Sequence, residues 1–300
     1  MEFRHGLGIF YAAVGTLFFA TSPIFTLLIQ GISPGGIAFL RMFLGSMFIL
    51  AFAKLRGKRI TIPGTDLKKF LLYGFIAAMH FLFYIYSLFY TTIAHSLSIV
   101  YTAPIFVTLL SSLVLKEPLP RYKYIGIGLV IIGIAVITGF EPLLSSRMII
   151  GDMMALVSAF CFGLYSVAGR KERENYTLFQ YTFWLYLFAA IFLLPFGAGS
   201  LKPDYLIKAA VPIIFLALLP TTLGHTMYNA SVRHTHAAYS NLISTQEVTG
   251  GIILGYFVLN QVPGINTFLG CGIMFAGLGI VLIDRNPFSD ISKKRKENAN

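Results

Sequence analysis

Residues 244–256 read STQEVTGGIILGY and lie in the middle of an apolar segment that runs from about Ala237 to Leu259. This segment carries a single carboxylate, Glu247. In a helix that rises 1.5 Å per residue, Glu247 would sit near the midplane of a bilayer whose apolar core is about 30 Å thick. An ionised side chain there costs roughly 2.5–3.5 kcal/mol on insertion scales. We therefore expect this helix to face a protein interior or a wet cavity. A structural glutamate satisfied by a polar neighbour is the alternative.

The composition of the chain is that of a membrane protein. Of its 300 residues, 56% are apolar and only 12% are charged, and the mean hydropathy is +0.76. Soluble domains carry roughly 25% charged residues. The first apolar run, residues 7–29, is too long for the core of a signal peptide and has no cleavage site followed by a soluble domain. It is expected to be the first spanning helix.

Apolar runs long enough to span a bilayer recur along the whole chain. Short connections between them leave no room for a soluble domain. The sequence therefore predicts an all-α integral membrane protein with ten transmembrane helices. These are expected at about residues 7–29, 34–54, 69–90, 94–115, 122–139, 149–169, 177–197, 208–232, 237–259 and 264–284.

The basic residues gather on one side of this predicted topology. Of the 23 Lys and Arg residues, Arg147, Lys202 and Lys208 fall on the opposite side, and Arg41 lies inside a span. All the others belong to termini and loops of the first side, which the positive-inside rule assigns to the cytoplasm. Both termini are therefore expected in the cytoplasm, with the protein in the cell (plasma) membrane. The net charge of +11 reflects this topology, and no nucleic-acid partner is predicted.

The two halves of the chain repeat each other at an offset of 144 residues without a gap. Five helices per half is an odd number, so the second half enters the membrane upside down relative to the first. Such inverted repeats build transporter folds whose substrate site lies near the midplane, where the halves meet. The predicted parts are a first repeat at 1–139, a second repeat at 149–284 and a basic cytoplasmic tail at 285–300. The matched pairs include Gly126 with Gly270, Gly128 with Gly272, Gly133 with Gly277, Tyr84 with Tyr228, Ser87 with Ser231, and Ser96 with Ser240.

Each half resembles the EamA-type repeat of the drug/metabolite transporter superfamily. The first half carries the likeness most fully in residues 102–137, TAPIFVTLLSSLVLKEPLPRYKYIGIGLVIIGIAVI. In this stretch Pro104 lies in the fourth helix and Glu117 follows that helix, ahead of a glycine-studded fifth helix. Arg41, in the stretch AFLRMF, matches an arginine that is often present in the second helix of the repeat.

The second half departs from that pattern at two positions. Glu247 matches a glutamate often found there, but Val248 replaces the expected proline and Gln261 replaces the expected acidic residue. The resemblance implies a ten-helix transporter. It leaves the substrate and its coupling open, because the superfamily includes exporters of amino acids and metabolites, drug carriers and nucleotide-sugar carriers.

Pro104 is expected to interrupt the fourth helix. It removes a backbone donor and frees a carbonyl one turn earlier, beside Tyr101 and Thr102. By the repeat register, Thr245 and Gln246 occupy the corresponding turn of the ninth helix. The fourth and ninth helices are therefore expected to present related polar centres to a substrate cavity. A kink that matters only for packing is the alternative.

Arg41 lies about 10 Å deep in the second predicted span, counted at the standard helical rise. Its long stem could carry the guanidinium outward to the interface. It could instead reach toward Glu247 and lower the cost of burying both charges. Its repeat counterpart is Trp184, so only one half carries this charge.

Four further residues are candidates for the cavity. His80 and His225 are single imidazoles in the middle of spans, suited to relaying protons or binding a carboxylate. Tyr84 and Tyr228 are related by the repeat, and their rings and hydroxyls suit a planar, polar substrate. Ordinary packing of these rings is the alternative.

Together these features predict a secondary active transporter that works by alternating access. Its substrate would be a small polar or amphipathic metabolite such as an amino acid, with protons as a candidate coupling ion. Export is favoured through the resemblance alone; an importer or a nucleotide-sugar-like exchanger is the alternative.

Other classes of protein are disfavoured. An integral-membrane enzyme needs converging acid and base groups, yet Glu247 is the only carboxylate deep in the predicted spans, and a channel would show passive, non-saturating flux. No phosphate-binding loop is present, so ATP is not the direct energy source. Cys161 and Cys271 lie in apolar segments, and neither a cofactor nor a metal is predicted. The partners expected are a small-molecule substrate and the lipid bilayer, with a monomer and a homodimer both open.

The topology can be tested at the loop that joins the second and third spans. In a background without Cys161 and Cys271, an Ile60→Cys variant should react with a membrane-impermeant thiol reagent from the cytoplasmic face only. The positive-inside rule gives this expectation. Labelling from the outer face would overturn the topology and the inverted-repeat argument with it.

Overall fold

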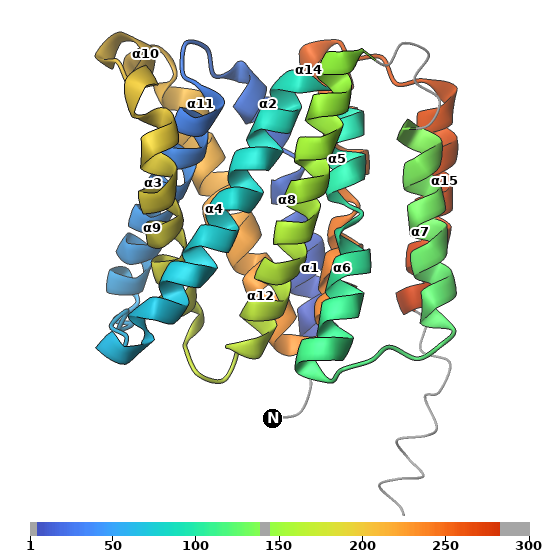
Figure 1. The fold of residues 1–300 in the computed structure, drawn as a ribbon, viewed down its shortest axis with the longest axis horizontal. Helices are drawn as coiled ribbons and strands as arrows, with labels where there is room; N and C mark the ends of the chain where they lie inside the picture. Colours follow the sequence, from blue (N-terminus) through green and yellow to red (C-terminus); the bar gives the residue numbers. More distant parts are fainter. Residues whose placement is uncertain (1–4, 139–144, 283–300) are drawn as a thin grey trace, which may run out of the picture.

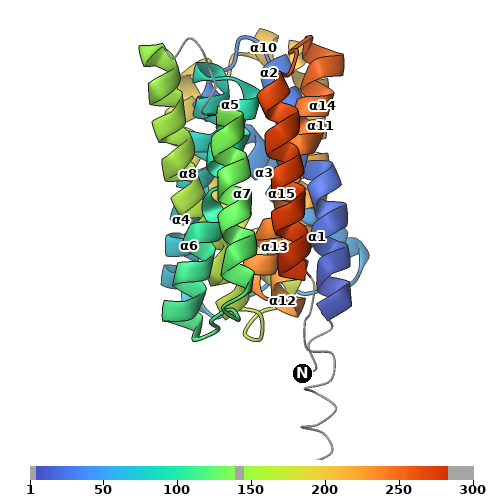
Figure 2. The same ribbon diagram turned by 90° about the vertical axis from the view of Figure 1, so that its right-hand side faces the viewer.

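The computed structural model describes residues 5–138 and 145–282. Over these ranges the regular structure is helical, with no strand, and the helices form an upright bundle (Figures 1 and 2). The prediction of an all-α protein is confirmed. We call the end at which α1 begins the lower end, as drawn in Figure 1, and the other the upper end. The predicted basic tail, 285–300, lies outside the described residues.

In the described ranges, nine helical segments are long and apolar enough to cross a membrane, and each coincides with a predicted span. The chain is therefore a multi-pass membrane protein. The predicted span at 122–139 contains α7 (Lys123–Thr138), a shorter apolar helix, and α10 (Pro203–Lys208) is a short connector. The nine segments are α1–α2 (His5–Phe19, Ser22–Leu28), α3 (Pro34–Leu55), η1–α4 (Gly64–Asp66, Leu67–Tyr90), α5–α6–η2 (Ile93–Val100, Ala103–Leu110, Ser111–Leu115), α8 (Ser146–Lys171), α9–η3 (Leu178–Gly197, Ala198–Ser200), α11–η4–α12 (Ala210–Leu216, Ala217–His225, Thr226–His234), α13–α14 (Ala237–Ser244, Glu247–Leu259) and α15 (Ile265–Leu282).

The helices pack most extensively in pairs that take one member from each half of the chain. These pairs are α7 with α15, α3 with α9, α4 with α8, α4 with α9, and α1 with α12. The α7–α15 pair forms one edge of the bundle and α3 with α9 the opposite edge (Figure 1), and Figure 2 shows α7 and α15 side by side. The remaining helices lie between these edges and enclose the centre.

Glycines allow α7 and α15 to approach each other closely. A Cβ added to Gly126 would lie 2.6 Å from the carbonyl oxygen of Gly277, and one on Gly133 would lie 2.6 Å from that of Gly270. Small residues of this kind let helix backbones meet in membranes, where apolar attraction between helices is weak. Two of the three matched glycine pairs, Gly126 with Gly270 and Gly133 with Gly277, thus have a packing reason.

Three spans are interrupted in mid-membrane, at Ala20–Thr21, Tyr101–Thr102 and Thr245–Gln246. A proline follows closely in the first two, and the second is the interruption expected at Pro104, but Val248 holds that place in the third. There the Thr245 hydroxyl donates to the carbonyl of Leu242 at 2.7 Å and so competes with the backbone hydrogen bonds of the helix. The ninth span is therefore broken without a proline, at the turn that the repeat register indicated.

The α7–α15 contact gives a test with an internal control. Gly133→Ala should lower the melting temperature of the purified protein, because the new methyl group overlaps a backbone carbonyl and overpacking costs typically about 1–3 kcal/mol. A Cβ on Gly128, on the same helix, would meet nothing within 4 Å. Gly128→Ala should leave the melting temperature unchanged or higher. Equal effects of the two substitutions would contradict the close backbone contact.

Candidate functional site

A small cavity, here called the central cavity, lies where the spans are interrupted. Its volume is about 20 Å³, room for roughly one water molecule. The start of α2, the end of α5, the end of η4 and the start of α14 all contribute to its wall. Ten residues line it: Phe19, Ser22, His80, Tyr84, Leu97, Val100, Tyr101, Phe162, His225 and Glu247.

Glu247 is buried in the wall of the central cavity, with 6% of its surface exposed. One carboxylate oxygen accepts a hydrogen bond from the hydroxyl of Tyr101, and the other accepts one from Tyr84 at 3.4 Å. The residue begins α14, and helix N-termini favour negative charge. The carboxylate therefore has polar neighbours and also faces the cavity.

Arg41 is completely buried, so its guanidinium does not reach outward to the interface, and that alternative is wrong. Nε donates to the hydroxyl of Thr221 at 3.1 Å, and Nη1 donates to that of Ser22 at 3.4 Å. The hydroxyl of Tyr84 lies 3.5 Å from the Ser22 oxygen, and it also contacts Glu247. Arg41 is therefore linked to Glu247 through Ser22 and Tyr84 rather than by a direct ion pair.

Aromatic rings form much of the remaining wall. His80 stacks on Phe162, with ring centroids 4.8 Å apart, and His225 packs against Phe19 at 4.4 Å. Nδ1 of His80 lies 3.1 Å from the carbonyl oxygen of Ser158 and 2.9 Å from the hydroxyl of the same residue. Both imidazoles are thus packed among rings and exposed to the central cavity.

Tyr228 lies just below the central cavity and does not line it. Its hydroxyl is 2.6 Å from the hydroxyl of Ser166 and accepts a hydrogen bond from the amide of Asn241 at 3.2 Å. Asn229 and Tyr165 form a second buried pair at this level. Together these side chains make a buried polar layer between the cavity and the lower end.

Four other predicted residues shape the helix interruptions instead of lining the central cavity. The hydroxyls of Thr102 and Thr245 donate to carbonyls of their own chain three residues earlier. Gln246 lies beside Thr245 and Thr249, and Pro104 sits in the first turn of α6.

Of the eleven residues expected at the site, the structure thus places five in the wall. They are His80, Tyr84, Tyr101, His225 and Glu247. Sequence reasoning missed Phe19, Ser22, Leu97, Val100 and Phe162. Of these only Ser22 could have been inferred from the sequence, because it is a polar residue directly before a mid-span proline.

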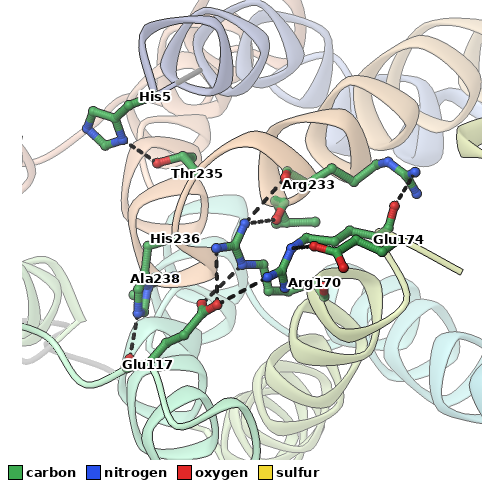
Figure 3. A network of polar contacts seen from close by, with 10 residues as sticks. His5, Glu117, Arg170, Glu174, Arg233, Thr235, His236 and Ala238 are labelled. Carbon is green, nitrogen blue, oxygen red and sulfur yellow. Dashed lines mark hydrogen bonds and ion pairs between the residues drawn. The ribbon is translucent and has the colours of Figure 1, made fainter. Parts of the chain in front are cut away.

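An ionic cluster lies at the lower end of the bundle, and Figure 3 shows its contacts from close by. Arg170 of α8 donates two hydrogen bonds of 3.1 Å to the carboxylate of Glu117, which follows η2. It also donates to the backbone carbonyls of Val232 and Arg233 at the end of α12. One buried guanidinium therefore ties together the lower ends of three spans. Sequence reasoning noted Glu117 but not its partner.

His236 belongs to the same end and caps α13. Nδ1 accepts from the backbone N–H of Ala238 at 3.1 Å, and Nε2 lies 2.7 Å from the carbonyl oxygen of Glu117. These contacts fit a neutral ring that donates from Nε2. Burial lowers the pKa of His236, while its bond to the Glu117 carbonyl opposes this shift.

The upper side of the central cavity is closed differently, by close apolar contact. A Cβ added to Gly250 would lie 2.6 Å from the Ala20 side chain, and one added to Gly251 would lie 2.6 Å from that of Leu97. Gln261 stands at the repeat position of Glu117 and cannot form the corresponding ion pair. Different interactions thus border the central cavity on its lower and upper sides.

Comparisons with known proteins agree with this architecture. The chain matches the EamA-like transporter family over residues 6–139 and 149–283. It is 22% identical to the uncharacterized transporter YoaV of Bacillus subtilis (strain 168), over 80% of this chain and 84% of that protein. It is 25% identical to an uncharacterized transporter of Archaeoglobus fulgidus, over 89% of this chain and 94% of that protein.

A solved structure, described only as "Crystal structure of protein", shares the fold with a TM-score of 0.77. It is 15% identical in sequence, over 93% of this chain and 97% of that chain. The family is one of membrane transporters, so the expectation of a transporter acting on a small molecule, rather than an enzyme, is confirmed. On the match over both halves, the chain belongs to the EamA-like transporter family, as its resemblance to the drug/metabolite transporter superfamily implied.

Proposed function

We propose that this protein is a secondary active transporter that moves a small polar or amphipathic metabolite by alternating access, with Glu247 at the substrate site. The observation that carries the proposal is a buried carboxylate in a ring-lined cavity where four spans are interrupted or irregular. Many transporters coordinate their substrates and ions with discontinuous helices at the bilayer midplane.

The proposal includes ten spans in two inverted repeats, with both termini in the cytoplasm of the cell (plasma) membrane. Repeated contacts support it. Ser87 lies 2.5 Å from Ser96, and Ser231 lies 2.6 Å from Ser240, which are the same contacts 144 positions later. Lys116 and Asn260, also 144 apart, are the two non-glycine residues with positive φ among those described. Matching turns of this kind are expected of two copies of one five-helix unit.

The size of the central cavity indicates what state the protein is in. A volume of about 20 Å³ admits a water molecule but no metabolite. In this proposal the ionic cluster below and the glycine contacts above are the two closures of the pathway. We assign this conformation to the occluded state of the cycle. Substrate access then requires one of the two closures to separate.

The chemistry of the wall favours a substrate with an amine and an apolar or aromatic portion. Glu247 offers a counter-ion for the amine, and Phe162 and Phe19 offer faces for the apolar portion. Amino acids meet this description. The direction we propose is export, by resemblance to the exporters of the superfamily, with import or nucleotide-sugar-like exchange as the alternative.

Two roles for Glu247 fit this wall. As a proton carrier, the carboxyl would bind a proton from one side and release it to the other as access alternates. As a fixed ligand, it would stay ionised and pair with the substrate amine. Burial favours the first role, because it disfavours the charged form, and the positive charge of Arg41 favours the second.

Glu247→Gln separates these roles, since it keeps the shape and removes the charge. The variant should insert and fold but lose gradient-driven uptake of labelled amino acids in proteoliposomes. The rate should fall by roughly tenfold or more, because a hydrogen bond to a charged group is lost. Glu172→Gln is the matched control, because Glu172 is also buried and accepts from a tyrosine, Tyr73. It should transport normally.

The outcome for Glu247→Gln identifies the role of the carboxyl. Retained substrate exchange with the pH dependence gone supports the proton carrier. Loss of substrate binding itself supports the fixed ligand. Wild-type rates at every pH and membrane potential would show that the carboxylate is only structural.

The ionic cluster should hold the lower end closed. Glu117→Gln removes the negative charge of a bidentate pair and leaves Arg170 buried without it. Hydrogen bonds to a charged group stabilise a fold by about 1.5–3 kcal/mol, so we expect a destabilisation of that size. Amide hydrogen exchange should therefore speed up at residues 110–117 and 166–173. Glu174→Gln removes an exposed carboxylate from the same cluster and is the control. Equal exchange in both variants would show that the pair does not govern this closure.

A further inference from the structure

A second and larger cavity, here called the side cavity, lies in the lower half of the bundle. Its volume is about 760 Å³, and α1, α3, α9, η4 and α12 supply its walls. It shares no lining residue with the central cavity. It is therefore a separate space on the flank of the bundle, and the roles proposed for Glu247 do not use it.

The inner wall of the side cavity is mostly apolar. Ile49 and Phe52 line it from α3, and Leu223 and Met227 line it from η4 and α12. From Ile49 to Arg56 the helix advances about 10 Å, which is within the depth of one leaflet of a bilayer whose apolar core is about 30 Å thick. An acyl chain matches an apolar space of that depth, whereas water has few partners there.

The mouth of the side cavity is basic. Arg56 and Lys58 line it at the C-terminal end of α3, where the helix dipole also favours cations. Gly57, with φ of 60°, turns the chain there, and Lys58 N–H bonds to the Ala53 carbonyl at 2.8 Å. This turn has the hydrogen bonds of a Schellman motif. Its backbone conformation is therefore fixed, and it places Arg56 and Lys58 at the mouth of the side cavity.

The two cations are available to a ligand. Both residues are exposed, and in the described part of the chain neither side chain has a hydrogen bond or ion pair. A phosphate group satisfies such cations, and arginine binds it with two parallel donors. Basic pockets between spans at the cytoplasmic side are suited to anionic lipid headgroups.

We propose that the side cavity binds one anionic phospholipid of the cytoplasmic leaflet. Its phosphate lies between Arg56 and Lys58, and one acyl chain lies along Ile49, Phe52, Leu223 and Met227. The assignment of the leaflet rests on the proposed topology. The site itself does not depend on the transported substrate, so its test reads lipid binding rather than transport.

The test is native mass spectrometry of the purified full-length protein with dioleoylphosphatidylglycerol or dioleoylphosphatidylcholine added. The wild type should retain one phosphatidylglycerol in preference to phosphatidylcholine. Arg56→Ala/Lys58→Ala should weaken that retention by roughly tenfold or more, as expected for two cations that contact anionic lipid. Lys54→Ala/Arg59→Ala removes two charges from the same helix end, outside the cavity, and should bind as the wild type does.

Further measurements separate a seated lipid from a soluble anion and from general attraction to a basic surface. Met227→Trp fills the apolar part while keeping both cations, and it should also lose the bound lipid. Equal retention by the two double variants would show attraction to the basic surface as a whole and overturn the site. Displacement of the lipid by excess inorganic phosphate, with normal binding by Met227→Trp, would indicate a site for soluble anions and overturn it as well.

Discussion

The cost of placing a carboxylate in the middle of a membrane organises this structure. Glu247 can be accommodated there only because its oxygens accept from Tyr101 and Tyr84, from the first half of the chain. Arg41 is held by Thr221 and by Ser22, which also contacts Tyr84. Each charge of the centre thus takes partners from the opposite half, so the polar site and the meeting of the halves depend on each other.

The two closures proposed for the pathway differ in the interactions that opening would have to break. The lower one is a bidentate ion pair between Arg170 and Glu117, whose strength depends on exclusion of water. The upper one is contact between Gly250, Gly251 and apolar neighbours, which separates at the cost of dispersion and lipid contacts. Gln261 stands where the first repeat has Glu117, so the two states of the proposed cycle need not have equal energy.

Much of the fold followed from hydropathy, since nine predicted spans recur as long helices in the described ranges. The register also matched Thr245 and Gln246 to the turn at Tyr101–Thr102, and the ninth span is interrupted there although Val248 is not a proline. The direction of side chains at an interruption was not predictable, because a broken turn changes the helical phase. Tyr101 therefore faces the cavity, whereas Thr102 bonds to its own backbone. Ser22, the link between Arg41 and Tyr84, depends on three separate helices meeting, which no local pattern encodes.

The element η4 lies between the central cavity and the side cavity, and its residues line both. It is a π-helix containing Pro220, and the hydroxyls of Thr221 and Thr222 bond to carbonyls five residues earlier. His225 lines the central cavity, Leu223 lines the side cavity, and Thr221 holds Arg41. A ligand shifts a conformational equilibrium only by its difference in affinity between states. Because η4 lines both cavities, a lipid in the side cavity would affect the central one only if η4 differs between the states of the proposed cycle.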